Sequence, residues 1–316
     1  MNILVCGAGG FIGGYLMASL KQQGHTVVGA DIKLHEYRPA DIDPVYQIDL
    51  RDQNKVLDLF RQHNFDRVYQ LAANMGGAGF VFTGENDTDI LNDSVQINLN
   101  IINAMRCSNV TEVLYTSSAC VYPEYAQLDS TDARLKESQA YPAAPDSEYG
   151  WEKLFSERLY LAAARNLGWR VRIARLHNIF GPLGAWNNGK EKAPAALCRK
   201  IAQADNGIIE IWGTGNQTRS FLYIDECIQG IHRLWDSNYE LPVNLGSERM
   251  ISIGELTQLI ATIANKNIQI KSITGPTGVP ARTSDNELIK QVLGWSPQDN
   301  LEYGLTQTYK WIESQL

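Results

Sequence analysis

A serine pair and a cysteine follow a short apolar run near the middle of the chain. The run EVLYT is typical of a buried strand that ends at about Thr116, and SSAC follows it at residues 117–120. Polar side chains just past the carboxyl end of such a strand suit a ligand site, because open α/β sheets bind ligands there. Cys120 then has two interpretations. It is either a small buried hydrophobe, the commonest role of a lone cysteine, or a group that takes up and releases protons.

A tyrosine and a lysine four residues apart are a second candidate for proton transfer. In YGWEK, residues 149–153, Tyr149 and Lys153 share one face of a predicted helix. An ammonium beside a phenol favours the phenolate, so the phenol could exchange a proton with a substrate hydroxyl near neutral pH. A solvated helix face is the alternative, because this spacing is common by chance. The glycine loop upstream and the serine pair favour the chemical interpretation.

Two lysines in a glycine-rich segment could supply an acid. Lys190 and Lys192 lie in GKEK, just before a predicted helix that begins at about Ala195. A lysine that loses its solvent in a cleft has its pKa lowered towards neutrality, and its ammonium would then match a thiolate as an acid–base pair. Solvated loop charges are the alternative for both lysines, and their spacing does not choose between them.

A glycine loop near the N-terminus predicts a dinucleotide site. GAGGFIG, residues 7–13, follows the strand ILVC and opens a helix. Gly7 permits the turn, Gly10 lets the backbone approach a pyrophosphate, and Gly13 lets the helix pack closely on the strand. Asp31 ends the second strand, where a carboxylate binds ribose hydroxyls and repels a 2′-phosphate. The loop therefore predicts NAD rather than NADP, with a tight turn that binds nothing as the alternative.

A second acidic residue, Asp49, lies at the end of the third predicted strand, in QIDLRD. It could contact the adenine of the dinucleotide. It could equally be the N-cap of the helix that follows, because aspartate is one of the preferred capping residues.

The elements that must position these residues alternate along the first two hundred residues. Predicted strands at 3–6, 26–30, 45–48, 67–72, 112–116 and 171–176 alternate with helices that end near Lys21 and that cover 52–63, 94–107 and 147–167. Apolar strands separated by amphipathic helices predict an α/β fold with a Rossmann-type doubly wound parallel sheet.

A polar, glycine-rich loop, GPLGAWNNGKEKAP, begins at Gly181. The strands and helices that follow it predict a smaller C-terminal α/β lobe that is interleaved with the first. We expect residues 1–176 to form the NAD-binding domain, with a later segment of about 215–248 interleaved, and residues 177–316 to form mainly a substrate-binding lobe. The strands expected in this part are IIEIWG, RSFLYI, VNLG and IQIKSI, with a helix from Asp225.

Composition narrows the class of partner. The chain has 316 residues and a net charge of −7 without a basic stripe, so we expect no nucleic acid partner. The five cysteines and five histidines lack metal-ligand spacing, so we predict no metal site. Scattered cysteines and the lack of a signal-peptide pattern or a long apolar run favour a cytoplasmic protein that does not enter a membrane.

These motifs together resemble the extended short-chain dehydrogenase/reductase family, the NAD-dependent epimerases and dehydratases. The motifs are GAGGFIG, LAA at 71–73, SS at 117–118, YGWEK and NIFGP at 178–182. The resemblance implies a Rossmann domain with tightly held NAD, and it implies that Ser118, Tyr149 and Lys153 carry out hydride transfer on a sugar. The residues predicted to hold NAD are Gly7, Gly10, Phe11, Ile12, Gly13, Asp31, Asp49, Leu71, Ala72, Ala73, Ser117, Tyr149 and Lys153.

A narrower resemblance is to the GDP-mannose 3,5-epimerases. It is carried by AANMGGAGF (72–80), SSACVYPE (117–124), HNIFGPLGAWNNGKEKAPAALCRK (177–200), GNQTRSFLYIDEC (215–227) and SDNELIKQVLGW (284–295). It implies oxidation of the mannose at carbon 4 and inversion of carbons 5 and 3 through the 4-keto sugar. It also implies that Cys120 and Lys192 are the acid–base pair. The substrate-contacting residues that it implies are Met75, Gly76, Gly77, Ser118, Cys120, Asn178, Lys192, Arg219 and Arg282, of which the arginines hold the diphosphate.

The chain departs from the plant pattern of that group at a few positions. Asn74 stands in place of an aspartate, Lys190 in place of an arginine, and Pro280 and Ala281 lie in a stretch that is rich in glycine and arginine. The predicted catalytic residues are unaffected. Another nucleotide-sugar epimerase or a dehydratase of the same family is the alternative function. By resemblance, the helices at about 94–107 and 147–167 pair in a homodimer.

Overall fold

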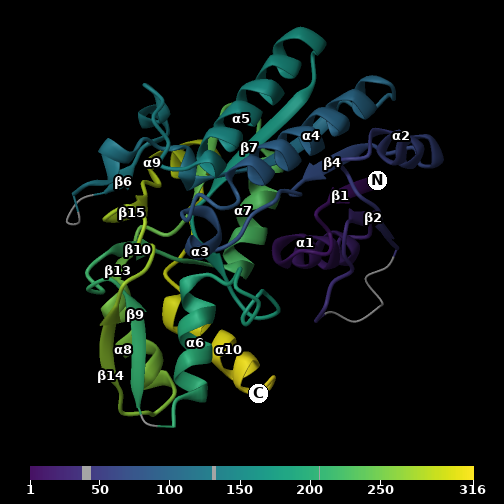
Figure 1. The fold of residues 1–316 in the computed structure, drawn as a ribbon. Coiled ribbons are helices and arrows are strands. Elements are labelled where there is room, and N and C mark those ends of the chain that lie inside the picture. Colours follow the sequence, from purple (N-terminus) through teal and green to yellow (C-terminus); the bar gives the residue numbers. More distant parts are fainter. Residues whose placement is uncertain (38–43, 130–132, 206) are drawn as a thin grey trace.

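A seven-stranded parallel sheet organises the first part of the molecule (Figure 1). The structure is a computed structural model that describes residues 1–37, 44–129, 133–205 and 207–316. The strand order is β12-β7-β5-β4-β1-β2-β3, and every neighbouring pair is parallel. The strands are β1 (Asn2–Cys6), β2 (Thr26–Asp31), β3 (Val45–Gln47), β4 (Arg67–Gln70), β5 (Glu112–Ser118), β7 (Arg170–Leu176) and β12 (Val243–Leu245).

Helices cover both faces of this sheet, which is why its strands read as continuous apolar runs. Leu4 and Cys6 of β1 lie in a core with α2 (Gln53–Gln62), α4 (Asp87–Arg106) and α5 (Glu148–Leu167). Alternate residues of β1, Ile3 and Val5, lie in a second core with α1 (Phe11–Gln22) and α7 (Ile224–Asp236). In Figure 1, α4 and α5 run side by side on one face while α1 and α7 lie on the other. The predicted α/β class and doubly wound parallel sheet are confirmed.

The second lobe is built from short strands and helices (Figure 1, left side and bottom). A four-stranded sheet has the order β13-β10-β15-β6, and β11 pairs with β8 and β14 with β9. Its strands are β6 (Arg134–Leu135), β8 (Ile179–Phe180), β9 (Ile208–Trp212), β10 (Thr218–Ser220), β11 (Leu222–Tyr223), β13 (Met250–Ser252), β14 (Gln269–Ile273) and β15 (Ala281–Ser284). Its helices are α6 (Ala193–Gln203), α8 (Ile253–Ile263), α9 (Glu287–Leu293) and α10 (Leu301–Glu313).

The chain crosses between the seven-stranded sheet and the second lobe more than once, so the second lobe is interleaved with the first part, as expected. Within 215–248, α7 and β12 pack on or join the seven-stranded sheet, whereas β10 belongs to the four-stranded sheet. The domain division at residue 176 stays a prediction. None of the described helices combines the length and apolar character needed to cross a lipid bilayer.

Some element boundaries differ from those expected. Strand β5 continues to Ser118 instead of ending at Thr116, because residues 112–118 all pair with β7. Helix α4 begins at Asp87 rather than residue 94, and a short helix, α3 (Ala78–Val81), precedes it. RSFLYI is two strands rather than one, because β10 pairs with β13 and β15 while β11 pairs with β8.

Candidate active site

The glycine loop joins β1 to α1 at a very close packing distance. Gly7 has a φ of +83°, in the left-handed region, and a Cβ there would lie 2.8 Å from the amide nitrogen of Ala72. A Cβ at Gly13 would lie 2.1 Å from the carbonyl oxygen of Gly7. Among the described residues, no side chain caps α1 at Gly10. The loop therefore leaves backbone amides at a helix N-terminus, which is the arrangement that binds a pyrophosphate.

The two aspartates that were predicted to contact the dinucleotide have different hydrogen-bond partners. Asp31 is buried, and its carboxylate accepts hydrogen bonds from the amides of Gly9 (2.9 Å) and Lys33 (3.0 Å). Burial raises the pKa of Asp31, against the effect of these hydrogen bonds. Asp49 accepts from Arg51, which lowers its pKa. Its alternative role as a helix N-cap is wrong, because Asp52 caps α2.

All residues predicted to hold NAD line one cavity at the carboxyl ends of the strands. Its volume is about 510 Å³, and β1 and β4, between which the strand order reverses, both lead into it. Of the other predicted residues, it is also lined by Met75, Ser118 and Lys192. The closely packed glycines of the loop and the carboxylate of Asp31 fit a dinucleotide.

The cavity has further polar lining residues that the sequence did not indicate. They include Lys33, Arg51 and Asn188. Lys33 follows Asp31 by two residues, so a basic residue just after the ribose-binding position was the available signal. No spacing rule would have found Arg51, whose guanidinium lies 2.9 Å from the carboxylate of Asp93 on α4.

Tyr149 and Lys153 are buried together on α5, which begins at an N-cap formed by Ser147. The Lys153 ammonium donates to the carbonyl oxygen of Thr116 (3.1 Å) and lies 5.6 Å from the centre of the Tyr149 ring. Burial raises the pKa of Tyr149, and a hydrogen bond with Ser118 only partly opposes this. The expected shift of Tyr149 towards phenolate is therefore not seen. Burial also lowers the pKa of Lys153.

The two serines of the SSAC segment have different partners. The Ser117 hydroxyl donates to the buried carboxylate of Glu157 (2.5 Å), so its side chain belongs to an internal network. Ser118 lies at the end of β5, and its hydroxyl accepts from the amide of Cys120 (3.2 Å). Ser118 therefore both lines the cavity and starts the short 3₁₀ turn Ala119–Val121 that carries the cysteine.

Cys120 is partly buried beside Tyr149, in an apolar cluster that includes Val81 and Ile90. It is not among the residues that line the 510 Å³ cavity. The turn that carries it packs on α5 so closely that a Cβ at Gly150 would lie 2.1 Å from the Cys120 carbonyl oxygen. Its sulfur accepts from the guanidinium of Arg282 at 3.0 Å.

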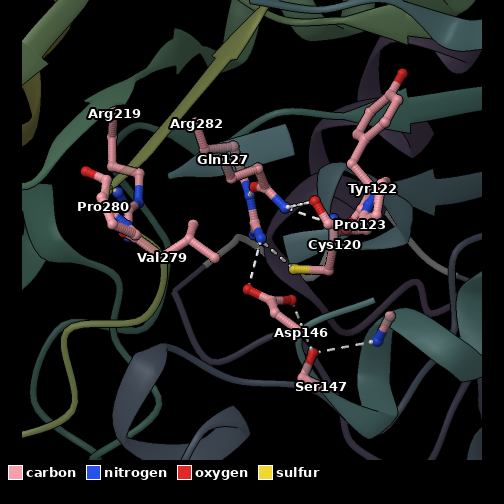
Figure 2. Close-up of polar contacts among 12 residues, drawn as sticks. Cys120, Tyr122, Pro123, Gln127, Asp146, Ser147, Arg219, Val279, Pro280 and Arg282 are labelled. Atoms are coloured by element: carbon pink, nitrogen blue, oxygen red, sulfur yellow. Dashed lines mark hydrogen bonds and ion pairs between the residues drawn. The ribbon is translucent and has the colours of Figure 1, made fainter. Parts of the chain in front are cut away.

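Arg282 and Arg219 lie opposite each other on β15 and β10, as Figure 2 shows. Arg282 is buried and forms an ion pair with Asp146 (2.8 Å). Arg219 donates to backbone carbonyls, including those of Thr277 (3.0 Å) and Val279 (2.7 Å). Burial, with the charge of Arg282, lowers the pKa of Arg219 to about 10.

Lys192 is half-buried at the N-terminus of α6. Burial lowers its pKa, as does the nearby charge of Arg282, while Cys120 opposes the shift. Lys190, the other candidate, has its ammonium 4.1 Å from the centre of the Phe80 ring. Its lowered pKa reflects burial and the charge of Lys33 rather than the cysteine. Of the two lysines, only Lys192 has a pKa that the charge of Cys120 affects.

Three further residues were predicted to contact the substrate, and each makes a close contact within the protein. They are Gly76, Gly77 and Asn178. Gly77 donates its amide to the carbonyl of Lys190 (3.0 Å), and a Cβ on Gly77 would lie 2.3 Å from the carbonyl oxygen of Glu191. A Cβ on Gly76 would meet Phe80. Asn178 has a positive φ of 45°, and its side-chain amide donates to the carbonyl of Ser220 (2.9 Å).

Comparison with known proteins identifies the family. The sequence profile described as "NAD dependent epimerase/dehydratase family" matches residues 3–246. The chain belongs to this NAD-dependent epimerase/dehydratase family. Its cofactor is accordingly NAD, as the glycine loop and Asp31 predicted.

Relatives within the epimerase/dehydratase family cover the whole chain. The chain is 43% identical over 318 residues to GDP-mannose 3,5-epimerase of Arabidopsis thaliana, covering 100% of this chain and 83% of that protein. It is also 43% identical to GDP-mannose 3,5-epimerase 1 of Oryza sativa subsp. indica, covering 100% of this chain and 82% of the relative. The crystal structure of UDP-glucose 4-epimerase with UDP-glucose from Thermotoga maritima superimposes with a TM-score of 0.88 at 20% identity, covering 100% and 99% of the chains. At that identity the superposition confirms the fold alone.

Proposed function

We propose that the chain inverts carbons 3 and 5 of GDP-mannose through transient oxidation at carbon 4, giving GDP-L-galactose, GDP-L-gulose or both. The observation that carries this proposal is the grouping of Cys120 with Arg282 and Tyr149 next to the dinucleotide cavity, which Tyr149 and Lys192 both line. A 4-epimerase needs no acid–base pair for the carbons that flank carbon 4. The 43% identity with the Arabidopsis enzyme over the full chain supports the choice of GDP-mannose.

Oxidation at carbon 4 requires the hydroxyl proton to leave. We assign its removal to Tyr149, with Ser118 holding the same hydroxyl and Lys153 holding a dinucleotide ribose. NAD supplies, when bound, a hydride acceptor whose oxidised ring carries a positive charge. A positively charged ring held close to Tyr149 would favour the phenolate and oppose the rise in pKa that burial causes. The same phenol returns the proton when the ketone is reduced.

Inversion depends on a base and an acid on opposite faces of the 4-keto sugar. The ketone makes the hydrogens on carbons 3 and 5 acidic. Cys120, as thiolate, takes the proton from one of these carbons, and Lys192, as ammonium, delivers a proton to the other face. The resulting thiol and neutral amine exchange their protons with water before the next inversion. Because the ketone at carbon 4 is reduced again at the end, no external NAD is consumed.

The nucleotide sugar needs contacts beyond the reacting carbons. We assign Met75, Gly76, Gly77 and Asn178 to the sugar. Gly77 brings backbone close to the segment that carries Lys192, and Met75 lines the same cavity as Lys192. Arg219 is assigned to the diphosphate, since a guanidinium offers bidentate hydrogen bonds to phosphate oxygens. Arg282 is likewise assigned to the diphosphate. Both assignments follow the resemblance, since the guanidiniums of Arg219 and Arg282 contact protein groups in this structure.

We infer a homodimer formed through α4 and α5. Trp151 and Phe155 of α5 are exposed one helical turn apart, with side chains 42% and 48% accessible. On α4, Leu91, Val95 and Leu99 form a partly exposed apolar stripe at the same spacing. Two adjacent helices with one apolar stripe each can pair with a second copy about a two-fold axis.

We also propose that the protein is cytoplasmic, which its five free thiols support.

Sedimentation velocity tests the dimer. Phe155→Glu should give a monomer, because a carboxylate would be buried without a partner at the interface. Leu241→Glu, at an exposed residue outside both helices, should leave a dimer. A dimer that persists in Phe155→Glu and in Trp151→Glu would exclude this interface.

Product analysis tests the reaction. The purified protein is incubated with GDP-mannose, and in parallel with UDP-glucose, without added NAD, and the sugars are separated after hydrolysis. We expect galactose or gulose from GDP-mannose and no conversion of UDP-glucose. Conversion of UDP-glucose alone, or release of a deoxy-keto sugar from GDP-mannose, would instead identify a 4-epimerase or a dehydratase and refute the proposal.

A further inference from the structure

The guanidinium of Arg282 has three partners, one on each nitrogen (Figure 2). Its Nε donates to the side-chain oxygen of Gln127 (2.5 Å), Nη1 to the sulfur of Cys120 (3.0 Å), and Nη2 to the carboxylate of Asp146 (2.8 Å). Arginine carries only hydrogen-bond donors, so the sulfur is the acceptor.

This contact favours one protonation state of the sulfur. A thiolate accepts a charge-assisted hydrogen bond far better than a thiol, which is a weak acceptor. Arg282 is 5% exposed, and the side chain of Asp146 is 5% exposed. Away from bulk water the attraction between a guanidinium and a thiolate is less screened than at the surface. The carboxylate of Asp146 balances part of the charge that the buried guanidinium brings.

We propose that Arg282 holds the Cys120 sulfur as a thiolate before any sugar binds, and that Gln127 and Asp146 are positioning residues that fix its guanidinium. The inference rests on the proposed function only for the use of that thiolate as a base. It gives Arg282 a task besides the diphosphate contact implied by resemblance.

The positioning residues connect the guanidinium to both chemical segments. Gln127 is fully buried, and its side-chain nitrogen donates to the carbonyls of Tyr122 and Pro123, so its oxygen has a fixed direction. It ends the 3₁₀ turn that follows the one carrying Cys120. Asp146 precedes the N-cap of α5, the helix that carries Tyr149. The orientation of Arg282 is therefore set by the same two segments that place the sulfur and the phenol.

Other charged or titratable groups interact electrostatically with the sulfur and must be kept constant in a test. They are Lys192 at the start of α6, Arg219 on β10, and Tyr149 and Lys153 on α5. Because Gln127 is uncharged, replacing it changes the placement of the guanidinium without changing the net charge. This makes Gln127→Met the cleanest test of positioning, and Arg282→Met the test of the charge itself.

The experiment measures the alkylation rate of Cys120 by iodoacetamide in the NAD-loaded protein, without sugar nucleotide, from pH 5.5 to 9.5. Peptide mass spectrometry separates Cys120 from the exposed Cys107, which serves as the internal reference. Each profile is scaled to its own plateau at high pH, so a change in access does not enter. Arg282→Met should lower the scaled rate at pH 7 about tenfold or more, because an opposite charge within a few ångströms has been removed. Arg282→Lys and Gln127→Met should lower it by less, about threefold, since a cation remains but is not held by its three partners.

Superimposable scaled profiles for the parent protein and Arg282→Met would overturn the inference. If Arg282→Met does not fold, unchanged profiles in both Arg282→Lys and Gln127→Met would overturn it equally. The readout does not depend on the proposed substrate. A shifted profile in a protein that fails to convert GDP-mannose would support the inference and refute the proposed function separately.

Discussion

Lys192 and Cys120 are each placed by a short segment whose backbone is packed closely against another part of the fold. Lys192 is the N-cap of α6, next to a loop in which the carbonyl oxygen of Lys190 accepts from the amide of Gly77. Cys120 lies in a single turn between β5 and the next 3₁₀ turn. The spacing of residues in the sequence could identify each as a candidate. It could not identify the contact with Arg282, because 162 residues separate the guanidinium from the sulfur.

The lowered pKa of Lys192 predicts a pH limit on inversion. If the ammonium delivers the proton, the reaction rate falls as pH rises through that pKa, because the proton is lost from the acid. The alkaline limb should therefore begin below the pH at which an exposed lysine titrates. It is measured as the pH profile of product formation from GDP-mannose at saturating substrate.

Arginine variants of two lysines at α6 test whether Lys192 sets the alkaline limb. Burial lowers the pKa of both Lys192 and Lys200. In Lys192→Arg the guanidinium keeps its proton, so the alkaline limb should move to higher pH even if the rate is lower. Lys200→Arg, on the outer part of α6, is the matched control and should leave the limb in place. An unshifted limb in Lys192→Arg would assign the proton donor to another group.

At the scale of elements, the β1–loop–α1 unit is the part of the site that follows most directly from sequence. The apolar run, the three glycines and the apolar face of α1 all indicate a strand, a tight loop and a helix in that order. Leu16 and Met17 are buried, as expected for the apolar face of α1. The four-stranded sheet of the second lobe was harder to foresee. Its strands have two to four residues each, too few for a periodicity to be read, and they come from four distant parts of the chain.

Gly13→Ala tests the close contact in this unit. The new Cβ would lie 2.1 Å from the carbonyl oxygen of Gly7, so α1 must move away from the loop. Such overpacking costs about 1–3 kcal/mol, which corresponds to an affinity for NAD about five- to 150-fold lower if it falls on the bound state. NAD retained after gel filtration should fall accordingly, as measured by absorbance after acid release.

The control for this variant is Gly254→Ala on α8. A Cβ there would lie 3.5 Å from the carbonyl oxygen of Gly215, an ordinary contact, and it lies outside the NAD cavity. NAD content should match that of the parent protein. Equal retention of NAD by Gly13→Ala would refute the assigned role of the loop packing.

At the scale of the whole molecule, a buried polar network connects the seven-stranded sheet with the second lobe. His177 is fully buried and hydrogen-bonds through Nε2 to the side chain of Asn244 (2.9 Å), a residue of β12. The Asn244 amide nitrogen also donates to the carbonyl of Leu135 in β6. Burial lowers the pKa of His177 to about 3.

This network predicts a dependence of stability on pH. His177 stays neutral in the folded protein, whereas in the unfolded chain it takes up a proton below its ordinary pKa of about 6.5. Proton uptake by the unfolded chain favours unfolding, so this contribution is complete above pH 6.5 and is lost progressively as pH falls towards 3. Between pH 7 and pH 5 the loss is about 2 kcal/mol.

The loss is measured as a difference between two proteins, because other groups titrate in the same range. Urea unfolding at a fixed NAD concentration gives the free energy of unfolding for the parent and for His177→Gln at pH 7 and pH 5. The parent should lose about 2 kcal/mol more than the variant. Equal losses would mean that His177 is protonated in the folded state.

The sequence predicted the sheet, the NAD loop and part of the lining of the cavity, because each depends on a local pattern or on the carboxyl ends of strands. It did not predict the electrostatics. The expected effect of Lys153 on Tyr149 is outweighed by burial, which depends on packing from β5 and α5 together. Gln127 and Asp146 gave no signal, since a lone glutamine or aspartate in a loop is usually solvated.

Deuterium incorporation tests the central claim most directly. The protein is incubated with GDP-mannose in heavy water, and the sugar is examined by NMR while the absorbance of NADH is followed. We expect deuterium at carbons 3 and 5 with no net change in NADH, and no incorporation in Cys120→Ala, which should still oxidise carbon 4. Products without deuterium at either carbon, or undiminished incorporation in Cys120→Ala, would contradict a thiol that removes protons from a 4-keto sugar.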